Sequence, residues 1–451
     1  MLAIIVAFGC GATSATSPPV HETAGLTSPV GSKAAPVASE SFGSRPLTLE
    51  ECIRLTLEKS PYMDMAQVEI NIKKIDAKNQ WWRMFPKLKL YVTNNVNLTT
   101  KDDKSRNKLS VSFLSGTWDP VGSYLSHDAS LLVTKLAKYE KLKTANELIA
   151  NVIKIYIHAE FFDLIMHEQR ELEELGQETL SYLQKMYPDA PVVPLEIRQA
   201  EQELKKVSSN RQTFVEQRVY TEMRAKRMMG IPVEQKIVLA KSDFADRVDT
   251  AYAPQKISYQ ELRSSALFAK MNAVRKELSN YGVYAAWADY VPKFTVAVRT
   301  PDPISSTTSG KEDFYLTLGI NVPLLYWGEL GRNIDRAKLA QKSEGYRRQI
   351  SELTKEDNWY KGLTEVRAMQ RDLDLSKVDL ELQELALRKS EILFDAGQAT
   401  YKDLVSAKVA VELKKIKLLS KQQNYLIRKL DAYALTGRLL NHYIEIKDDD
   451  L

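Results

Sequence analysis

Few residues in this sequence could form or break covalent bonds. The five histidines are His21, His127, His158, His167 and His442. Their spacing matches no metal-ligand pattern, and the chain has no HExxH motif, P-loop or GxGxxG loop. The two cysteines, Cys10 and Cys52, are too few for a disulfide framework or a CxxC site. We therefore expect no enzymatic activity and no bound cofactor or metal.

Composition narrows the class of protein. The 451 residues are 44% hydrophobic and 27% charged, which excludes a largely disordered chain. No run of about 20 apolar residues occurs, so a bundle of membrane-spanning helices is excluded too. The 63 basic and 58 acidic residues are interspersed along the chain, so we expect a solvated surface and no nucleic-acid partner.

The N-terminal region resembles an export signal followed by a tether. Residues 1–10, MLAIIVAFGC, look like the end of a lipoprotein signal or lipobox, in which Cys10 would be lipidated after cleavage. The alternative is the remnant of an ordinary cleaved signal with an incidental cysteine. Residues 11–46 are rich in Ser, Thr, Pro, Ala and Gly, and we expect them to form a flexible linker.

The rest of the chain is internally duplicated. Each half contains a helical segment, an aromatic cluster, a Pro-Lys pair and an alternating strand, with Pro86 and Pro292 at matching places. At an offset of 207 residues, Glu196 pairs with Asp403, and Gly230 with Gly437. The resulting domains are a first repeat, a linker or equatorial segment, a second repeat and a C-terminal tail, at 47–230, 231–256, 257–440 and 441–451.

Long helices dominate both repeats. Residues 120–187 contain no proline beyond the first position, and a continuous helix of 68 residues at about 1.5 Å per residue would span roughly 100 Å. The second repeat has coiled-coil spacing at Leu375, Val378, Leu382 and Leu385. Further apolar residues lie off this stripe, which favours helices that bury two faces, as in a closed ring.

Four short segments alternate between apolar and polar residues with the period of a β-strand. These segments are 87–98, 108–116, 293–300 and 313–322. They form two hairpins, and aromatic residues gather at the strand ends, which favours a membrane barrel over a soluble sheet packed on one face. Four strands cannot close a barrel, and open strand edges are not tolerated in lipid. The chain must then associate with copies of itself.

The sequence resembles the TolC-like outer-membrane efflux protein (OEP) family over roughly residues 47–440. The resemblance is carried by LTLEECIRLTLEKSP, FPKLKL, VPKFTV, GINVPLLYWGELGRNIDRAKLA and FDAGQATYKDLVSAK, in that order and duplicated. It implies a mainly α fold with a small β part, an elongated α-helical barrel protomer with two transmembrane β-hairpins. Three copies would share a twelve-stranded barrel, built from hairpins 87–114 and 293–322, and a twelve-helix periplasmic tunnel. Residues 231–256 and the C-terminal tail would form a belt around the tunnel.

The resemblance also implies a function, a location and partners. Members of this family are homotrimeric exit ducts in the outer membrane, with most of their mass in the periplasm. They serve tripartite efflux pumps or type I secretion systems, together with a periplasmic adaptor (membrane fusion) protein and an inner-membrane RND, MFS or ABC transporter. The cargo, whether drug, metal ion or protein, is chosen mainly by that transporter.

The family resemblance places a gate at the periplasmic tip. Asp403 falls on the position of a family gate aspartate, and Ser406 stands where a second acidic residue is usual, so a double carboxylate ring is in doubt. Glu196 and Gln199 are their counterparts in the first repeat. The alternative for Asp403 is a solvated aspartate near a helix start. The turns that would dock the adaptor contain Ala190, Pro191, Val192, Ala396, Gly397 and Gln398.

A protein of another class remains open, a soluble coiled-coil scaffold that links partners. Long apolar heptads are common in such proteins. This alternative explains the helices of the chain. It does not explain the four alternating segments or their placement after two matched prolines.

Overall fold

The computed structural model describes residues 46–96, 107–186, 195–240, 249–263, 266–299, 315–324 and 326–443. These all belong to one compact unit, Phe42–Leu451. Cys10 and the tether up to residue 45 lie outside the described residues, as do the turn with Ala190, Pro191 and Val192 and the residues after 443.

Two helices of 67 residues each run through this unit, α4 (Pro120–Met186) and α9 (Glu329–Asp395). Helix α4 begins at a proline, whose fixed φ suits the first helical position, and the Asp119 carboxylate accepts a hydrogen bond from Gly122 N at 2.8 Å. Its length of about 100 Å, at about 1.5 Å per residue, agrees with the helix predicted from residue 120. The mainly α class is confirmed.

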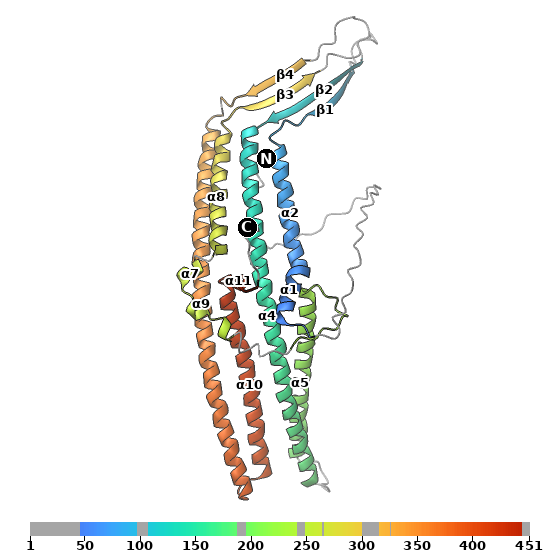
Figure 1. Ribbon diagram of the computed structural model, residues 1–451, viewed down its shortest axis with the longest axis vertical. Coiled ribbons are helices and arrows are strands. Elements are labelled where there is room, and N and C mark those ends of the chain that lie inside the picture. The colour runs from blue at the N-terminus through green and yellow to red at the C-terminus, as the bar shows by residue number, and fades with distance from the viewer. Residues whose placement is uncertain are drawn as a thin grey trace. The chain divides into compact units, whose positions relative to one another are not determined.

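The other helices are shorter, and most of them pack against these two. They are α1 (Leu49–Lys59), α2 (Pro61–Trp82), α5 (Leu195–Met228), η1 (Pro254–Lys256), α7 (Tyr259–Arg263), α8 (Ala266–Ala288), α10 (Tyr401–Ala434) and α11 (Leu439–Tyr443). Toward the sheet, the order of neighbours is α9, α8, α4 and α2. Toward the opposite end it is α9, α10, α4 and α5 (Figure 1). The helices thus form a single layer with α9 on one edge throughout.

The strands form one antiparallel sheet in the order β1, β2, β3, β4. Their bounds are β1 (Lys89–Val96), β2 (Asn107–Trp118), β3 (Lys293–Arg299) and β4 (Tyr315–Asn321). The two hairpins therefore pair with each other through β2 and β3.

The strand bounds differ slightly from those expected. Residues 87 and 88 precede the ladder of β1, and β2 extends two residues past 116. That extension follows an irregularity in the pairing of β2 with β3, where Gly116 has a φ of 65° and the Ser115 hydroxyl accepts a hydrogen bond from Val296 N at 2.7 Å. The bulge lets β2 continue to the start of α4. Residues 97, 98, 300, 313 and 314 lie outside the described ranges.

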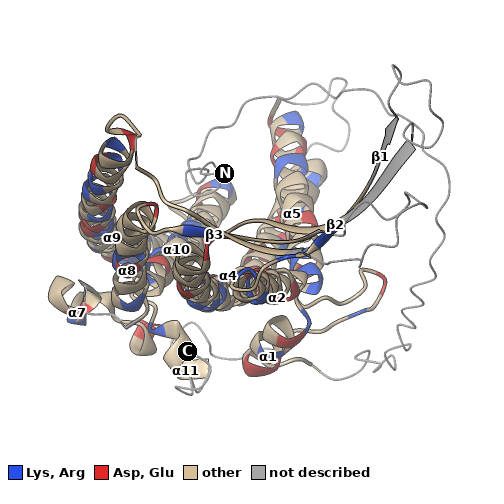
Figure 2. Ribbon diagram, turned by 90° about the horizontal axis from the view of Figure 1, so that it is seen from above, with Lys and Arg blue, Asp and Glu red and all other residues tan. Residues whose placement is uncertain are grey.

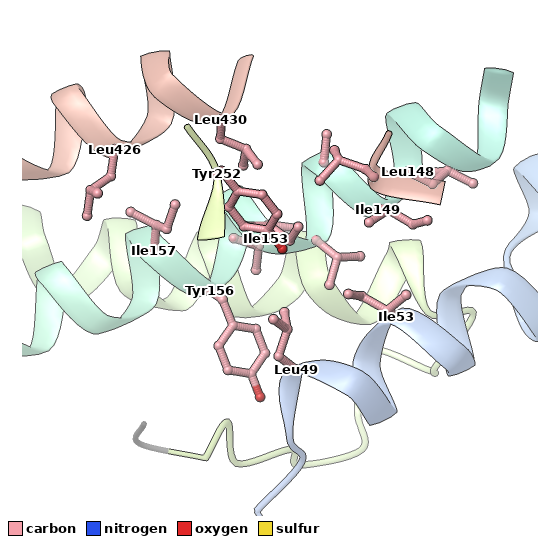
Figure 3. Close-up of a cluster of buried hydrophobic side chains, with 14 of the residues drawn as sticks. Leu49, Ile53, Leu148, Ile149, Ile153, Tyr156, Ile157, Tyr252, Leu426 and Leu430 are labelled. Carbon is pink, nitrogen blue, oxygen red and sulfur yellow. The ribbon is translucent and has the colours of Figure 1, made fainter. Parts of the chain in front are cut away.

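The main hydrophobic core lies midway along α4 (Figure 3). Ile149, Ile153 and Ile157 of α4 are fully buried against α1 and α10. The segment after α5 joins this core, because Leu239 forms a parallel bridge with Leu47 and Tyr252 packs inside the cluster. Residues from 231–240 and 249–257 therefore tie both repeats together at this level.

Leu148 provides a test of this core, because it is 5% exposed within the cluster. We expect Leu148→Ala to lower the free energy of unfolding by about 2 to 5 kcal/mol, through lost burial and the cavity left behind. The matched control is Leu131→Ala on the same helix, where Leu131 is 50% exposed, with an expected change within about 0.5 kcal/mol. Denaturant unfolding followed by the helical circular dichroism signal measures both. Equal losses for the two variants would contradict this assignment of the core.

Candidate functional site

One face of the sheet is apolar and exposed. The strand register aligns Leu90, Phe113, Val298 and Leu316 in a row across all four strands. Leu318 and Ile320 continue this face along β4, and both are more than 60% exposed. A soluble sheet would cover such a face with helices. Within the described residues, this face is left open.

The opposite face of the sheet carries mostly small and polar side chains. Ser112 of β2, Thr295 of β3, and Thr317 and Gly319 of β4 lie there, with Thr295 opposite Gly319. The alternation predicted from the sequence is therefore confirmed in the β-sheet register.

The outer strands, β1 and β4, each have one neighbour, so one edge of each has no strand partner among the described residues. Each edge strand is directly connected to an edge helix: α2 leads into β1, and β4 leads into α9. Sheet and helix layer thus share the same two edges.

The edge helices carry exposed apolar stripes in the half of the layer nearer the sheet. On α2 the stripe is Tyr62, Met65, Val68, Ile72 and Ile75. On α9 it is Leu339, Tyr346, Ile350, Leu353 and Tyr360. Spacings of three, four and seven residues place each set along one side of its helix. Both edges of the layer are therefore suited to pack against another helix.

Aromatic side chains gather where the strands meet the helices. Trp81, Trp82, Phe85, Tyr290 and Tyr326 are all exposed there. Trp118 is half-buried, and its indole N–H donates to the Met84 carbonyl at 3.0 Å.

Trp327 is the most exposed of these aromatics, at 85%. Its φ of 45° is rare for a bulky residue and marks a strained turn from β4 into α9. The turn is closed by Arg332, whose guanidinium donates to the Trp327 carbonyl at 3.2 Å. The exposed indole is placed as an interfacial side chain would be.

The turn between α9 and α10 has a well-defined geometry. Gly397 has a φ of 69°, which glycine adopts at little cost at a helix C-terminus. Backbone N–H groups of Gln398 and Ala399 both donate to the Leu393 carbonyl, at 2.8 and 3.1 Å. Ala396 is the C-cap of α9. Ala396, Gly397 and Gln398, proposed from the sequence as docking residues, are all exposed.

Asp403 takes part in a capping box at the start of α10. Its carboxylate accepts hydrogen bonds from the Thr400 hydroxyl at 2.7 Å and from Thr400 N at 3.0 Å. These bonds hold the pKa of Asp403 below its usual value, so the side chain is ionised at neutral pH. Asp403 is thus a capping residue and, at the same time, an exposed negative charge at the tip.

The other predicted gate residues lie apart from one another. Ser406 is exposed one turn beyond Asp403, whereas Glu196 and Gln199 are exposed on α5. Helix α4 lies between α5 and α10. Within one chain, the two pairs therefore line different helices and do not form one cluster.

A contact at the tip was not predicted from the sequence. The Tyr401 hydroxyl of α10 donates to the Glu178 carboxylate of α4 at 2.9 Å, and its ring lies 4.1 Å from that of Tyr182. Burial, then this hydrogen bond and the charge of Glu178, together raise the pKa of Tyr401 to about 12. The hydroxyl therefore keeps its proton. This contact joins the two helical hairpins near their ends.

A ladder of ion pairs between α9 and α10 was also missed. Acids seven residues apart on α9 face bases seven residues apart on α10. The pairs are Glu365 with Arg428 at 3.8 Å, Asp372 with Lys421 at 2.6 Å and Asp379 with Lys414 at 3.0 Å. The seven-residue period of opposite charges could have revealed it. Charges of both signs are interspersed on these helices (Figure 2).

The described part of the chain offers no metal site, since no three His, Cys, Asp or Glu side chains converge there. Across the same ranges, every helix is too short or too polar to cross a bilayer.

The fold matches solved structures of outer-membrane channels. CusC, described as forming a transmembrane channel, has a TM-score of 0.71 at 14% identity, covering 86% of this chain and 92% of that one. The MtrE outer membrane channel of Neisseria gonorrhoeae has a TM-score of 0.70 at 15% identity, covering 86% and 88%. VceC, an outer membrane protein of Vibrio cholerae, gives 0.66 at 15%, covering 86% and 96%. At such identities, the likeness establishes the TolC-like fold.

A family model also matches part of the sequence. Residues 257–438 match the family model OEP, Outer membrane efflux protein. No curated protein matches the sequence. The chain therefore has a TolC-like fold, and residues 257–438 are similar to the outer membrane efflux protein family.

The ion-pair ladder gives a prediction for Asp379 and Lys414. We expect Asp379→Lys and Lys414→Asp each to destabilise the hairpin and the double swap to recover part of the loss, with a coupling of about 0.5 kcal/mol. Denaturant unfolding of the two single variants and the double variant measures this coupling. Asp374→Lys combined with Lys414→Asp is the control, because Asp374 pairs with Lys377 on its own helix. Strictly additive effects of the Asp379 and Lys414 substitutions would show that these two side chains do not stabilise the hairpin as an ion pair.

Proposed function

We propose that this chain is one protomer of a trimeric outer-membrane exit duct. It would passively conduct substrates delivered by an inner-membrane transporter across the periplasm and the outer membrane, without chemistry of its own. Most of its mass would lie in the periplasm. The observation that carries this proposal is the exposed apolar sheet face with two open edges.

Strand closure supports self-association. In lipid, unpaired backbone N–H and C=O groups cost several kcal/mol each, so β1 and β4 need partners. Strand β4 of one copy and β1 of the next would run antiparallel, because neighbouring strands alternate in direction along the sheet. Closure by copies gives a barrel of eight, twelve or more strands. The TolC-like fold favours three copies and twelve strands.

The helix layer would close in the same way. The apolar stripes on α2 and α9 lie on the two edges that continue β1 and β4. Packing α2 of one copy on α9 of the next would bury both stripes. One arrangement of copies would therefore pair the open strand edges and also bury the apolar stripes of the helices.

A second exposed apolar stripe on α9 is suited to a helix of a different protein and not to a copy of this chain. Leu375, Val378, Leu382, Leu385 and Ile392 are all exposed toward the tip. The opposite edge of the layer at this level is α5, where Leu195 is exposed at the start of the helix and every exposed side chain between 196 and 217 is polar. A neighbouring copy would leave this stripe poorly covered. We assign it, with the turn 396–398, to a helix of a periplasmic adaptor that links the duct to an RND, MFS or ABC transporter.

The soluble scaffold is the weaker alternative. A scaffold that functions in water would expose its apolar sheet face and six bulky aromatic side chains without purpose. The same features have a direct use in a bilayer and its interfaces.

The sheet face provides the main test of the duct. We expect Leu318→Arg, on the apolar face of β4, to cost about 2 to 4 kcal/mol near the bilayer midplane and to deplete the protein from the outer membrane. The control is Thr317→Arg, the adjacent residue on the opposite face, which we expect to insert normally. Membrane fractionation measures both. Normal insertion of Leu318→Arg, or equal loss in both variants, would rule out a lipid-facing sheet.

The gate proposal for Asp403 can be separated from its capping role. Asp403→Asn keeps an oxygen that can accept from Thr400 but removes the charge, so we expect weaker cation selectivity in single-channel recordings. Thr400→Ala disrupts the capping box and keeps the charge, so we expect selectivity near that of the unmodified protein. Unchanged selectivity in Asp403→Asn would remove Asp403 from the gate.

A further inference from the structure

The seam between α4 and α10 joins the two helical hairpins below the main core. Helix α5 lies against α4, and α9 lies against α10, so α4 and α10 are the inner helices of the layer. Ile165 and Leu172 of α4 pack with Ile416 of α10 in a separate cluster, with Val409 half-buried beside it. The spacing is that of a coiled-coil seam.

Two glutamates interrupt this apolar seam at core positions. Glu168 lies between Ile165 and Leu172 on α4, and Glu412 precedes Ile416 by four residues on α10. Their side chains are only 21% and 14% exposed. Two carboxylates in one half-buried seam repel each other when both are ionised.

One cation serves both carboxylates. The Lys415 ammonium lies 2.7 Å from Oε1 of Glu412 and 3.9 Å from Oε2 of Glu168. A single positive charge cannot neutralise two negative ones. The other oxygen of Glu412, Oε2, is buried and has no hydrogen-bond partner in the described part of the chain, which is unfavourable.

One bound proton would balance the charges of the two carboxylates and Lys415. Burial raises the pKa of Glu168, and the hydrogen bond and charge of Glu412 raise it further, whereas Lys415 and His167 lower it. Protonated Glu168 has an O–H that could donate to Glu412. Lys415 would then pair with the single remaining negative charge.

The other charges near the seam leave this balance in place. Glu384 of α9 acts on Lys415 and favours its charged form. Arg211 of α5 forms an ion pair with Glu173 of α4 at 2.7 Å. It is not among the main charges that shift the pKa of Glu168.

We propose that Glu168 and Glu412 form a proton-binding pair that strengthens the α4–α10 seam when it holds one proton and weakens it when both carboxylates are ionised. Because the folded protein binds this proton more tightly than a free glutamate, the added stability is complete below the ordinary pKa near 4.5. It is lost as the pH rises through the raised pKa of Glu168. Acid therefore tightens the contact between the hairpins. The proposal concerns contacts within one chain and holds whether or not the protein is a duct.

Hydrogen exchange of the full chain in detergent tests the pair. Peptides covering 160–176 and 404–420 are compared between the unmodified protein and Glu412→Gln at about pH 5 and about pH 8, so that intrinsic exchange rates cancel at each pH. The amide side chain of Glu412→Gln keeps an acceptor for Lys415 and can donate to Glu168. At about pH 8 we expect the seam of Glu412→Gln to be better protected, by up to about tenfold for each unit by which the pKa of Glu168 is raised. At about pH 5 the two proteins should agree.

Two further variants secure the interpretation. Glu168→Gln should show the same protection as Glu412→Gln, and it replaces Glu412→Gln in the comparison if that variant fails to fold. Glu174→Gln removes an exposed charge from the same helix and should change neither peptide. Equal protection of the unmodified protein and both seam variants at both pH values would overturn the proposal. So would lower protection of the variants at both, which would make Glu412 an ordinary partner of Lys415.

Discussion

The outer edges of β1 and β4, which have no strand partner in the described part of the chain, constrain the rest of the structure. Each edge strand continues into an edge helix, α2 or α9, and both helices carry apolar stripes at the same level. An arrangement of copies that pairs the strands also buries the stripes. In the proposed duct, closing the sheet and closing the helix layer are therefore one event, and a single chain is an incomplete structure.

The two repeats share a layout but differ in how their hairpins are held. In the second repeat, acids at 365, 372 and 379 form the ion-pair ladder with α10. At an offset of 207, the first repeat has His158, Ile165 and Leu172, and the last two belong to the apolar cluster of the α4–α10 seam. The second hairpin therefore adds a solvated charged seam to its own share of the main core, which includes Val366 of α9 and Leu430 of α10. The stability of such a charged seam depends more on salt concentration and less on the burial of apolar surface. The Asp379–Lys414 ion pair, the carboxyl pair and the Tyr401 contact lie between the main core and the tip, whereas the main apolar core lies at the middle of α4.

Features with local causes could be predicted from the sequence. The long helix from Pro120 follows from the absence of proline, and the sheet faces follow from a period of two along each strand. The contact of Tyr401 with Glu178 could not be predicted, because it depends on the axial register of two helices more than 200 residues apart in sequence. The same holds for Glu168 and Glu412, each of which looks like an ordinary surface acid within its own helix. For Asp403 the sequence indicated an acidic residue near a helix start, while its capping bonds to Thr400 emerged only in the structure. Its role as a gate is still a prediction.

The central claim, that this chain is complete only in a ring of copies within a membrane, is tested most directly by native mass spectrometry of the full chain released from detergent micelles. The account predicts a particle of three copies that precipitates when detergent is removed. A monomer that stays in solution without detergent would contradict it.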